Sequence, residues 1–152
     1  MELAETQKAW LAAAIDGEGS ITFVTRKMTY RKKDGTCSNY VYHMPYVEIC
    51  NTVLDFVQHA KNISNIGYIK ISKSKNARVK TMFRWIVYNY GDISRLLPVI
   101  MPYLIIKREK AKRILTYINF RLTRGKTTKR GHLEQSLFSG TKTEIDEIAQ
   151  LL

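Results

Sequence analysis

The sequence predicts an α+β domain. Two helix–strand–strand units would form a mixed, mainly antiparallel four-stranded sheet, with helices on one face and further helices at the C-terminal end. Three observations predict this class: a helical period followed by two strand-like alternations occurs twice, 152 residues suit one domain, and 45% hydrophobic residues can supply a core. We therefore expect a single domain over 1–152, with its core over 5–120 and a basic extension with a helix over 121–152.

The first unit begins with a helix over residues 3–15, because apolar side chains recur there at helical spacing and Gly17 and Gly19 follow. Two strands are expected next, over residues 20–30 and 38–50. In the first of them Ile21 and Phe23 alternate with more polar residues, so one face is expected to be buried. A basic turn with an Asp-Gly pair joins the two strands.

The second unit repeats this order. A helix is predicted over residues 53–63, with Asn51 and Thr52 as candidate caps, followed by strands over 66–73 and 80–89. Asp92 is expected to cap a helix over 93–101, and Pro102 to redirect the chain. The remaining predicted segments are a long basic helix over 106–121, a basic loop over 122–140 and a final helix opened by a capping box at 141–144.

The formal charge of +12 is unevenly distributed. Residues 1–18 carry a net charge of −3, residues 19–91 carry +9 and residues 92–152 carry +6. A compact domain with this bias favours a polyanionic partner, foremost a nucleic acid. A generically basic surface, as in proteins associated with ribosomes, is the alternative that charge alone leaves open.

The sequence also bears on compartment. It has no apolar run long enough to span a membrane, and two acids in its first five residues argue against a targeting peptide. Two cysteines exclude a disulfide-dense secreted scaffold and favour a reducing compartment. We expect an intracellular protein, in the cytoplasm of a prokaryote or in an organelle.

The most informative segment is residues 11–21, which read LAAAIDGEGSI. Small residues there allow another helix to approach closely, and two glycines permit a tight exit from the helix into the following strand. That exit would place Asp16 and Glu18 at the edge of the sheet, where the helix ends. A carboxylate is a hard oxygen ligand of the kind that Mg²⁺ prefers.

This segment resembles the signature of the LAGLIDADG homing endonucleases, and it occurs once, as in the homodimeric branch of that family. Residues 102–107 (PYLIIK) are similar to the family's segment that carries an active-site lysine. Glu18 stands where Asp is commoner in the family. The resemblance implies a saddle-shaped sheet on double-stranded DNA with a long pseudo-palindromic target.

The resemblance also implies roles for single residues. Glu18 of both subunits would bind Mg²⁺ or another divalent cation together with the Gly17 carbonyl, Lys107 would stabilise charge on the phosphate, and Asn51 would orient water. The expected homodimer contact consists of Ala9, Ala12, Ala13 and Asp16, with Asp16 capping the partner's facing helix. The implied activity is metal-dependent hydrolysis of one phosphodiester in each strand, serving a mobile genetic element that is often an intron.

An antiparallel ribbon fits the major groove of DNA, so the face opposite Ile21 and Phe23 is the expected binding face. Its residues on the four strands are Thr22, Val24, Arg26, Met28, Tyr40, Tyr42, Met44, Tyr46, Glu48, Lys70, Ser72, Arg84 and Ile86. Phosphate contacts are expected from the turns and the basic extension, namely Arg31, Lys32, Lys33, Lys73, Lys75, Arg121, Arg124, Lys126, Lys129 and Arg130. Packing of the final helix on this face is an alternative use for its apolar residues.

Two other functions on the same scaffold stay open. Some members of the family assist intron splicing as RNA maturases, and others are non-cleaving DNA-binding regulators. The presence of Glu18 and Lys107 favours the nuclease over a pure regulator. The target sequence and the cut positions do not follow from the sequence.

Overall fold

The computed structural model describes residues 1–76 and 78–124. Of the loop predicted over 122–140, residues 122–124 belong to a helix instead, and the rest of it and the predicted final helix lie outside the described residues. The two helix–strand–strand units are present. The first consists of α1 (Glu5–Glu18), β1 (Gly19–Arg31) and β2 (Cys37–Asn51). The second consists of α2 (Leu54–Ser64), β3 (Tyr68–Ser72) and β4 (Met82–Val87). After them come α3 (Tyr90–Ile100), the short helix η1 (Met101–Tyr103) and α4 (Arg108–Arg124).

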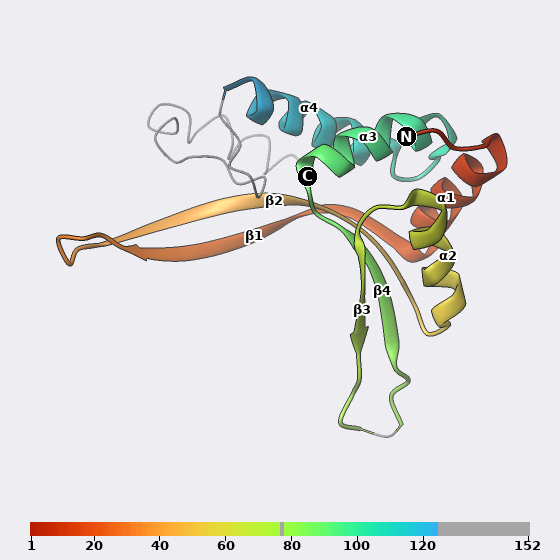
Figure 1. Cartoon of the computed structure of the whole chain (residues 1–152), viewed down its shortest axis with the longest axis horizontal. Helices are drawn as coiled ribbons and strands as arrows, with labels where there is room; N and C mark the ends of the chain where they lie inside the picture. The colour runs from red at the N-terminus through yellow and green to blue at the C-terminus, as the bar shows by residue number, and fades with distance from the viewer. Residues whose placement is uncertain (77, 125–152) are drawn as a thin grey trace.

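The four strands form one sheet in the order β1-β2-β4-β3. Each neighbouring pair is antiparallel, so the sheet has no parallel pair among the described residues, and the expected mixed character is not observed. In Figure 1 the β1–β2 ribbon and the β3–β4 ribbon diverge like the two sides of a saddle, and the helices lie together on the convex side. The concave face opposite the helices is uncovered by any described helix.

The core lies between the helices and the convex face of the sheet. Ile21, Val47, Ile49, Trp85 and Val87 on the strands are buried against apolar residues of the four α-helices. The alternation of the strands produces this layer, because Ile21 pairs with Val47 and Ile49 with Trp85 on the same face. Burial of this face fixes the register of the strands, so the opposite side chains face the concave side.

Several boundaries differ from the predictions. Helix α1 begins at Glu5 and continues through Gly17 to Glu18, instead of spanning residues 3–15. Helix α3 is capped by Asn89, whose side chain accepts hydrogen bonds from the N–H groups of Gly91 and Asp92, and Asp92 instead pairs with Arg95 at 2.6 Å. Among the described residues, no helix has both the length and the apolarity needed to cross a membrane.

Candidate active site and nucleic-acid interface

Glu18 is the last residue of α1, and its side chain is exposed. Gly19 follows it and begins β1 in a crowded position. A Cβ atom at residue 19 would lie 2.5 Å from the carbonyl oxygen of Glu48 and 2.8 Å from the Cα of Ile15. Only glycine therefore allows the end of α1 to meet β2 so closely, and this contact holds Glu18 at the junction of helix and sheet.

Asp16 joins α1 to the segment that precedes α4. Its carboxylate accepts hydrogen bonds from the backbone N–H groups of Ile105 (2.6 Å), Ile106 (3.1 Å) and Lys107 (2.9 Å). Partial burial opposes ionisation, but these three donors and the Lys107 charge outweigh it and lower the pKa of Asp16. The prediction that Asp16 caps a helix of the partner is corrected, because its carboxylate is engaged within its own chain.

Lys107 lies beside the end of α1. Its Nζ donates to the carbonyl oxygens of Ile15 at 2.9 Å and Asp16 at 2.5 Å. An ammonium group is favourable there because the last carbonyls of a helix carry partial negative charge. Lys107 thus contacts the backbone of Asp16, which is two residues before Glu18, although Lys107 and Glu18 are far apart in the sequence.

Asn51 ends β2, and its Oδ1 accepts a hydrogen bond from the N–H of Val53 at 2.9 Å, just before α2. The N-cap residue of α2 is Val53, and no side chain caps it, so Asn51 closes a turn before the helix and its predicted capping of the helix is not observed. Strand alternation puts Asn51 on the face of Ile49, toward the helices. Its expected role in orienting water stays a prediction.

One copy of the described chain cannot surround a divalent cation with side chains. Within residues 1–76 and 78–124, no three His, Cys, Asp or Glu side chains are grouped closely enough to hold a metal ion. What one copy offers is the exposed Glu18 carboxylate and the carbonyl groups at the end of α1, including that of Gly17. These hard oxygen donors suit Mg²⁺ or Ca²⁺, which would complete its coordination with water, with phosphate oxygens or with donors of another chain.

The concave face carries most of the residues expected to contact DNA. In β1 and β2, Thr22 pairs with Tyr46, Val24 with Met44, Arg26 with Tyr42, and Met28 with Tyr40. Of these residues, the ones in β1 together with Met44 and Tyr46 lie on the face opposite Ile21, as predicted, and the side chains of Tyr40 and Tyr42 lie outside the described part. In β3 and β4, Lys70 pairs with Arg84 and Ser72 with Met82 on the same face.

Two residues of this face differ from the prediction. Ile86 has the expected orientation but is only 2% exposed, so it supports the face rather than contacting a partner. Tyr68, which pairs with Ile86, is 43% exposed and was missed. The alternation Tyr68–Lys70–Ser72 within the predicted strand over 66–73 places it on the same face as Lys70.

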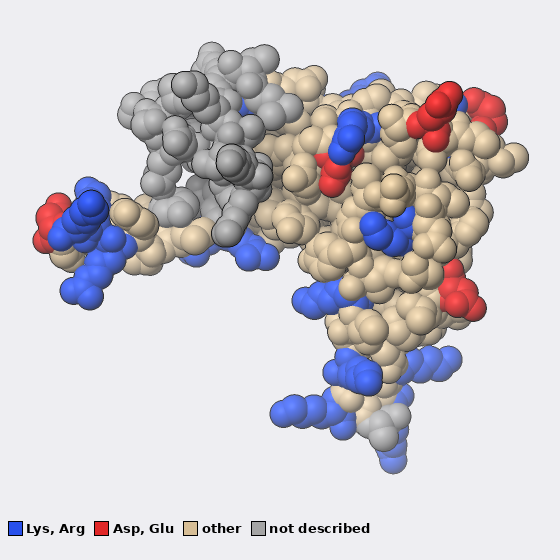
Figure 2. Space-filling model, viewed as in Figure 1, with Lys and Arg blue, Asp and Glu red and all other residues tan. Residues whose placement is uncertain are grey.

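Basic side chains gather at the tips of both ribbons, as Figure 2 shows. Arg31, Lys32 and Lys33 are exposed at the β1–β2 tip, where Gly35 has a positive φ of 83° and the Asp34 carboxylate accepts from the N–H and hydroxyl of Thr36. At the β3–β4 tip the exposed bases are Lys73 and Lys75 together with Arg78 and Lys80, which were not predicted.

Not every predicted phosphate contact is available. Arg121 is 9% exposed, and its guanidinium lies 5.5 Å from the ring centre of Tyr117. The low exposure of this side chain, which lies against Tyr117, argues against the predicted phosphate contact of Arg121. Arg124 ends α4, its side chain lies outside the described part, and so do Lys126, Lys129 and Arg130.

Fewer of the predicted contact residues on α1 are exposed than expected. Ala9 and Ala13 are exposed, but Ala12 is fully buried in its own chain and cannot form an interface. The exposed stripe consists of small residues at helical spacing, namely Thr6, Ala9, Ala13 and Gly17. A Cβ atom at Gly17 would contact nothing within 4 Å, so no group of the described chain requires glycine there.

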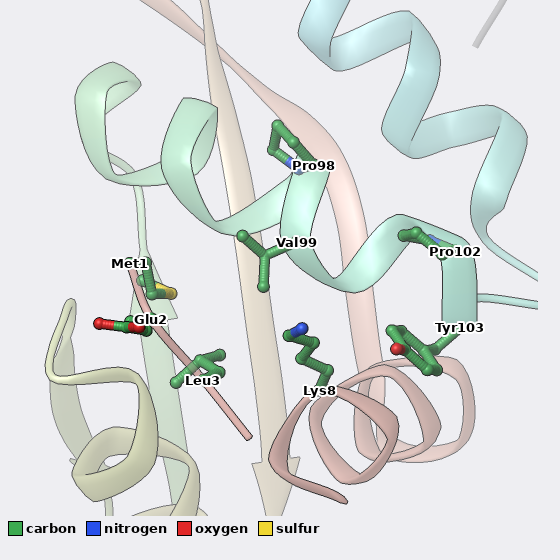
Figure 3. A pocket seen from close by; sticks show the side chains of 8 residues that line it. All are labelled: Met1, Glu2, Leu3, Lys8, Pro98, Val99, Pro102 and Tyr103. Carbon is green, nitrogen blue, oxygen red and sulfur yellow. The ribbon is translucent and has the colours of Figure 1, made fainter. Parts of the chain in front are cut away.

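A shallow pocket on the helical side is separate from these features. Figure 3 shows it between the N-terminal segment, α1, α3 and η1, with Lys8, Val99 and Tyr103 among its lining residues. Neither Glu18 nor Lys107 lines it. The pocket is therefore not the candidate active site.

The fold is shared with solved homing endonucleases. I-TnaI matches all of this chain and 89% of its own with a TM-score of 0.64 at 16% identity. I-CvuI in complex with the I-CreI target matches 78% of this chain and 69% of its own with a TM-score of 0.56 at 20% identity. I-SmaMI bound to its uncleaved DNA target in the presence of calcium ions matches 93% of this chain with a TM-score of 0.63 at 18% identity.

This chain spans only 42% of the length of that I-SmaMI chain. Comparison by sequence alone finds no matching family model and no matching curated protein. The similarity is thus carried by the three-dimensional arrangement of the two helix–strand–strand units. The protein has the fold of the LAGLIDADG homing endonucleases, as the resemblance of residues 11–21 predicted.

Proposed function

We propose that the protein is a site-specific, metal-dependent endonuclease that cleaves both strands of DNA. The observation that carries the proposal is the position of Lys107, whose ammonium group lies on the last carbonyls of α1 next to Glu18. A carboxylate and a fixed lysine at one end of a basic, concave sheet are the groups that phosphodiester hydrolysis needs. The solved neighbours I-CvuI and I-CeuI are homing endonucleases in complex with DNA, which supports the same ligand here.

In this proposal Glu18 and the Gly17 carbonyl hold a divalent cation jointly with the same groups of a second copy. Such a cation, when bound, lowers the pKa of a bound water and neutralises charge on the phosphate and the leaving oxygen. Lys107 adds a fixed positive charge where negative charge develops, and it needs no reorganisation because α1 already orients its Nζ. Asn51 orients water near the phosphate.

The concave face binds the duplex in the major groove. Strand β1 has 13 residues, which at about 3.3 Å per residue extend over roughly 40 Å, or a little more than one turn of B-DNA. Arg26, Arg84 and Lys70 present donors to base edges. The bases at both ribbon tips contact phosphates and set the register of the protein on the duplex.

A second copy completes the enzyme. The chain has one α1 end with one Glu18, and it spans less than half of the I-SmaMI chain that shares its fold. The exposed small residues Ala9, Ala13 and Gly17 allow two α1 helices to approach closely. Each copy would then cleave one strand of a pseudo-palindromic site.

Two other functions on this scaffold remain as alternatives: an RNA maturase and a DNA-binding regulator without cleavage. Retention of Glu18 and Lys107 at one site favours cleavage over regulation. If the reading frame lies inside an intron, the joined flanking sequences would give the target, and cleavage of that DNA is then testable directly.

The deciding experiment compares wild type with Glu18→Gln on the target DNA. Glu18→Gln removes the charge and keeps the shape, so cleavage in Mg²⁺ should be abolished while specific binding stays within a few-fold of wild type. Asp55→Asn is the matched control, because it removes an exposed acid on α2 and should cut normally. Cleavage by Glu18→Gln, or by wild type in excess EDTA, would refute the assignment.

A further inference from the structure

Four side chains from three strands meet on the concave face: Tyr46 and Glu48 of β2, Tyr68 of β3 and Arg84 of β4. The Tyr46 hydroxyl donates to Glu48 Oε2 at 3.3 Å, and Arg84 Nη1 lies 3.8 Å from the same oxygen. Burial and the neighbouring Glu48 charge raise the pKa of Tyr46 to about 12. The hydroxyl therefore stays protonated at neutral pH and remains a donor to Glu48.

The two charged side chains differ in depth. The Glu48 side chain is 20% exposed, and the Arg84 side chain is 42% exposed. The Nε of Arg84 is buried and lacks a hydrogen-bond partner among the described residues. Arg84 is thus the more exposed member of the pair, with only its Nε buried in this way, and Glu48 is the less exposed member.

We propose that Glu48 is a positioning residue for Arg84, and that Arg84 reads a guanine in the DNA target. This inference rests on the proposed function, since it requires a DNA duplex on the concave face. An arginine reads guanine by donating to O6 and N7 together, which demands a defined orientation of the guanidinium. The Glu48 charge favours that orientation before DNA arrives, so less side-chain freedom is lost on binding.

The geometry also argues against direct contact of Glu48 with a base, although Glu48 is among the residues expected on the DNA-binding face. Its Oε2 already accepts from Tyr46 and faces Arg84, and most of its side chain is buried. At 3.8 Å the Arg84 contact is an ion pair longer than a hydrogen bond. The N–H groups of Arg84 therefore remain able to donate to a base.

The test is selection from a randomised DNA library by wild type, Arg84→Ala, Glu48→Gln and the double variant. We expect Arg84→Ala to lose about 5-fold to about 150-fold of the preference at one base pair in each half-site. Glu48→Gln should weaken the preference at that same base pair and add nothing in the Arg84→Ala background. Glu48→Asp, which keeps the charge, should restore part of the preference.

Asp55→Asn controls for the added net charge, because it makes the same change on exposed α2 and should leave the preference intact. Thermal unfolding checks that each variant folds. Arg84→Lys keeps the charge without the planar guanidinium and should also lose the preference at that base pair. This variant tests the reading of guanine even if Glu48→Gln fails to fold. A preference that Glu48→Gln leaves unchanged, or alters at a different base pair, would overturn the inference while the proposed function stands. A wild type that selects no sequence at all would overturn both.

Discussion

At the scale of single residues, Asp16 is the feature that assembles the candidate site. Its carboxylate accepts hydrogen bonds from three backbone N–H groups that lie 89 to 91 residues away in the sequence, and one of them belongs to Lys107. The orientation of Lys107 toward the end of α1 therefore depends on Asp16. A change at residue 16 should disturb the site without touching a metal ligand.

Asp16→Asn is expected to destabilise the protein by about 0.5–1.5 kcal/mol at neutral pH, because one neutral amide oxygen replaces two charged carboxylate oxygens as acceptor for three N–H groups that are exposed or half-buried. The lowered pKa of Asp16 means that the stability from its ionised form is present above the ordinary carboxyl pKa and is lost as pH falls through the lowered value. The difference between wild type and Asp16→Asn should thus shrink below about pH 4.

Urea unfolding from pH 7 to pH 2 measures this difference. Asp55→Asn, an exposed acid on α2, should show little difference at any pH. A gap between wild type and Asp16→Asn that stays constant to pH 2 would mean that the carboxylate charge contributes nothing to this contact.

The limits of the sequence are clearest at this scale. The sequence indicates that Gly19 allows a tight exit from α1, because Gly17 and Gly19 alternate there with two acids. The partners of Asp16 could not be found, because they are backbone N–H groups that any sequence supplies, and only the fold brings residues 105–107 to α1. For the same reason, no local sequence pattern indicates that the Lys107 side chain contacts the end of α1.

At the scale of elements, strand alternation was far more informative than helix periodicity. The strands have one strongly apolar face, so their period of two fixed which side chains face the concave side, as for Arg26 and Lys70. Residues 9–15 of helix α1 are all small or apolar. Its rotation was therefore underdetermined, and the predicted interface wrongly included the buried Ala12.

The β1–β2 ribbon allows base reading and phosphate binding to be separated. Arg26 lies on the concave face opposite Tyr42, whereas Lys32 lies in the turn. We expect Arg26→Ala to relax the preference at one position in each half-site by about 1–3 kcal/mol. Lys32→Ala should weaken binding to all sequences about equally and reduce the slope of log affinity against log salt by about one.

A randomised-site selection run beside a salt titration measures both effects. Lys27 is a useful comparison, since it lies next to Arg26 but on the opposite face of the ribbon. Lys27→Ala should leave the base preference unchanged. An unaltered preference profile for Arg26→Ala would show that the duplex does not lie on the concave face at this strand.

At the scale of the whole molecule, the fold could be predicted because two patterns agreed. The repeated helix–strand–strand order gave the layers, and residues 11–21 gave the family resemblance that the shared fold with I-TnaI bears out. The residues available for the proposed contact between two copies did not follow from these patterns, because they depend on which few side chains the core leaves exposed. On α1 these include the stripe Thr6–Ala9–Ala13–Gly17.

Dimerisation through this stripe predicts that added bulk on α1 separates the subunits. Ala13 is exposed, so Ala13→Leu should leave the fold of one chain intact but overpack the helix contact and weaken the dimer by about 1–3 kcal/mol. Gly17→Ala adds one carbon that meets nothing within the chain, so it should weaken the dimer less while favouring the helix.

Thr116→Leu, on the exposed face of α4, is the matched control. Sedimentation equilibrium measures each association constant, and a wild type that stays monomeric at micromolar concentration, with and without DNA, would exclude this interface.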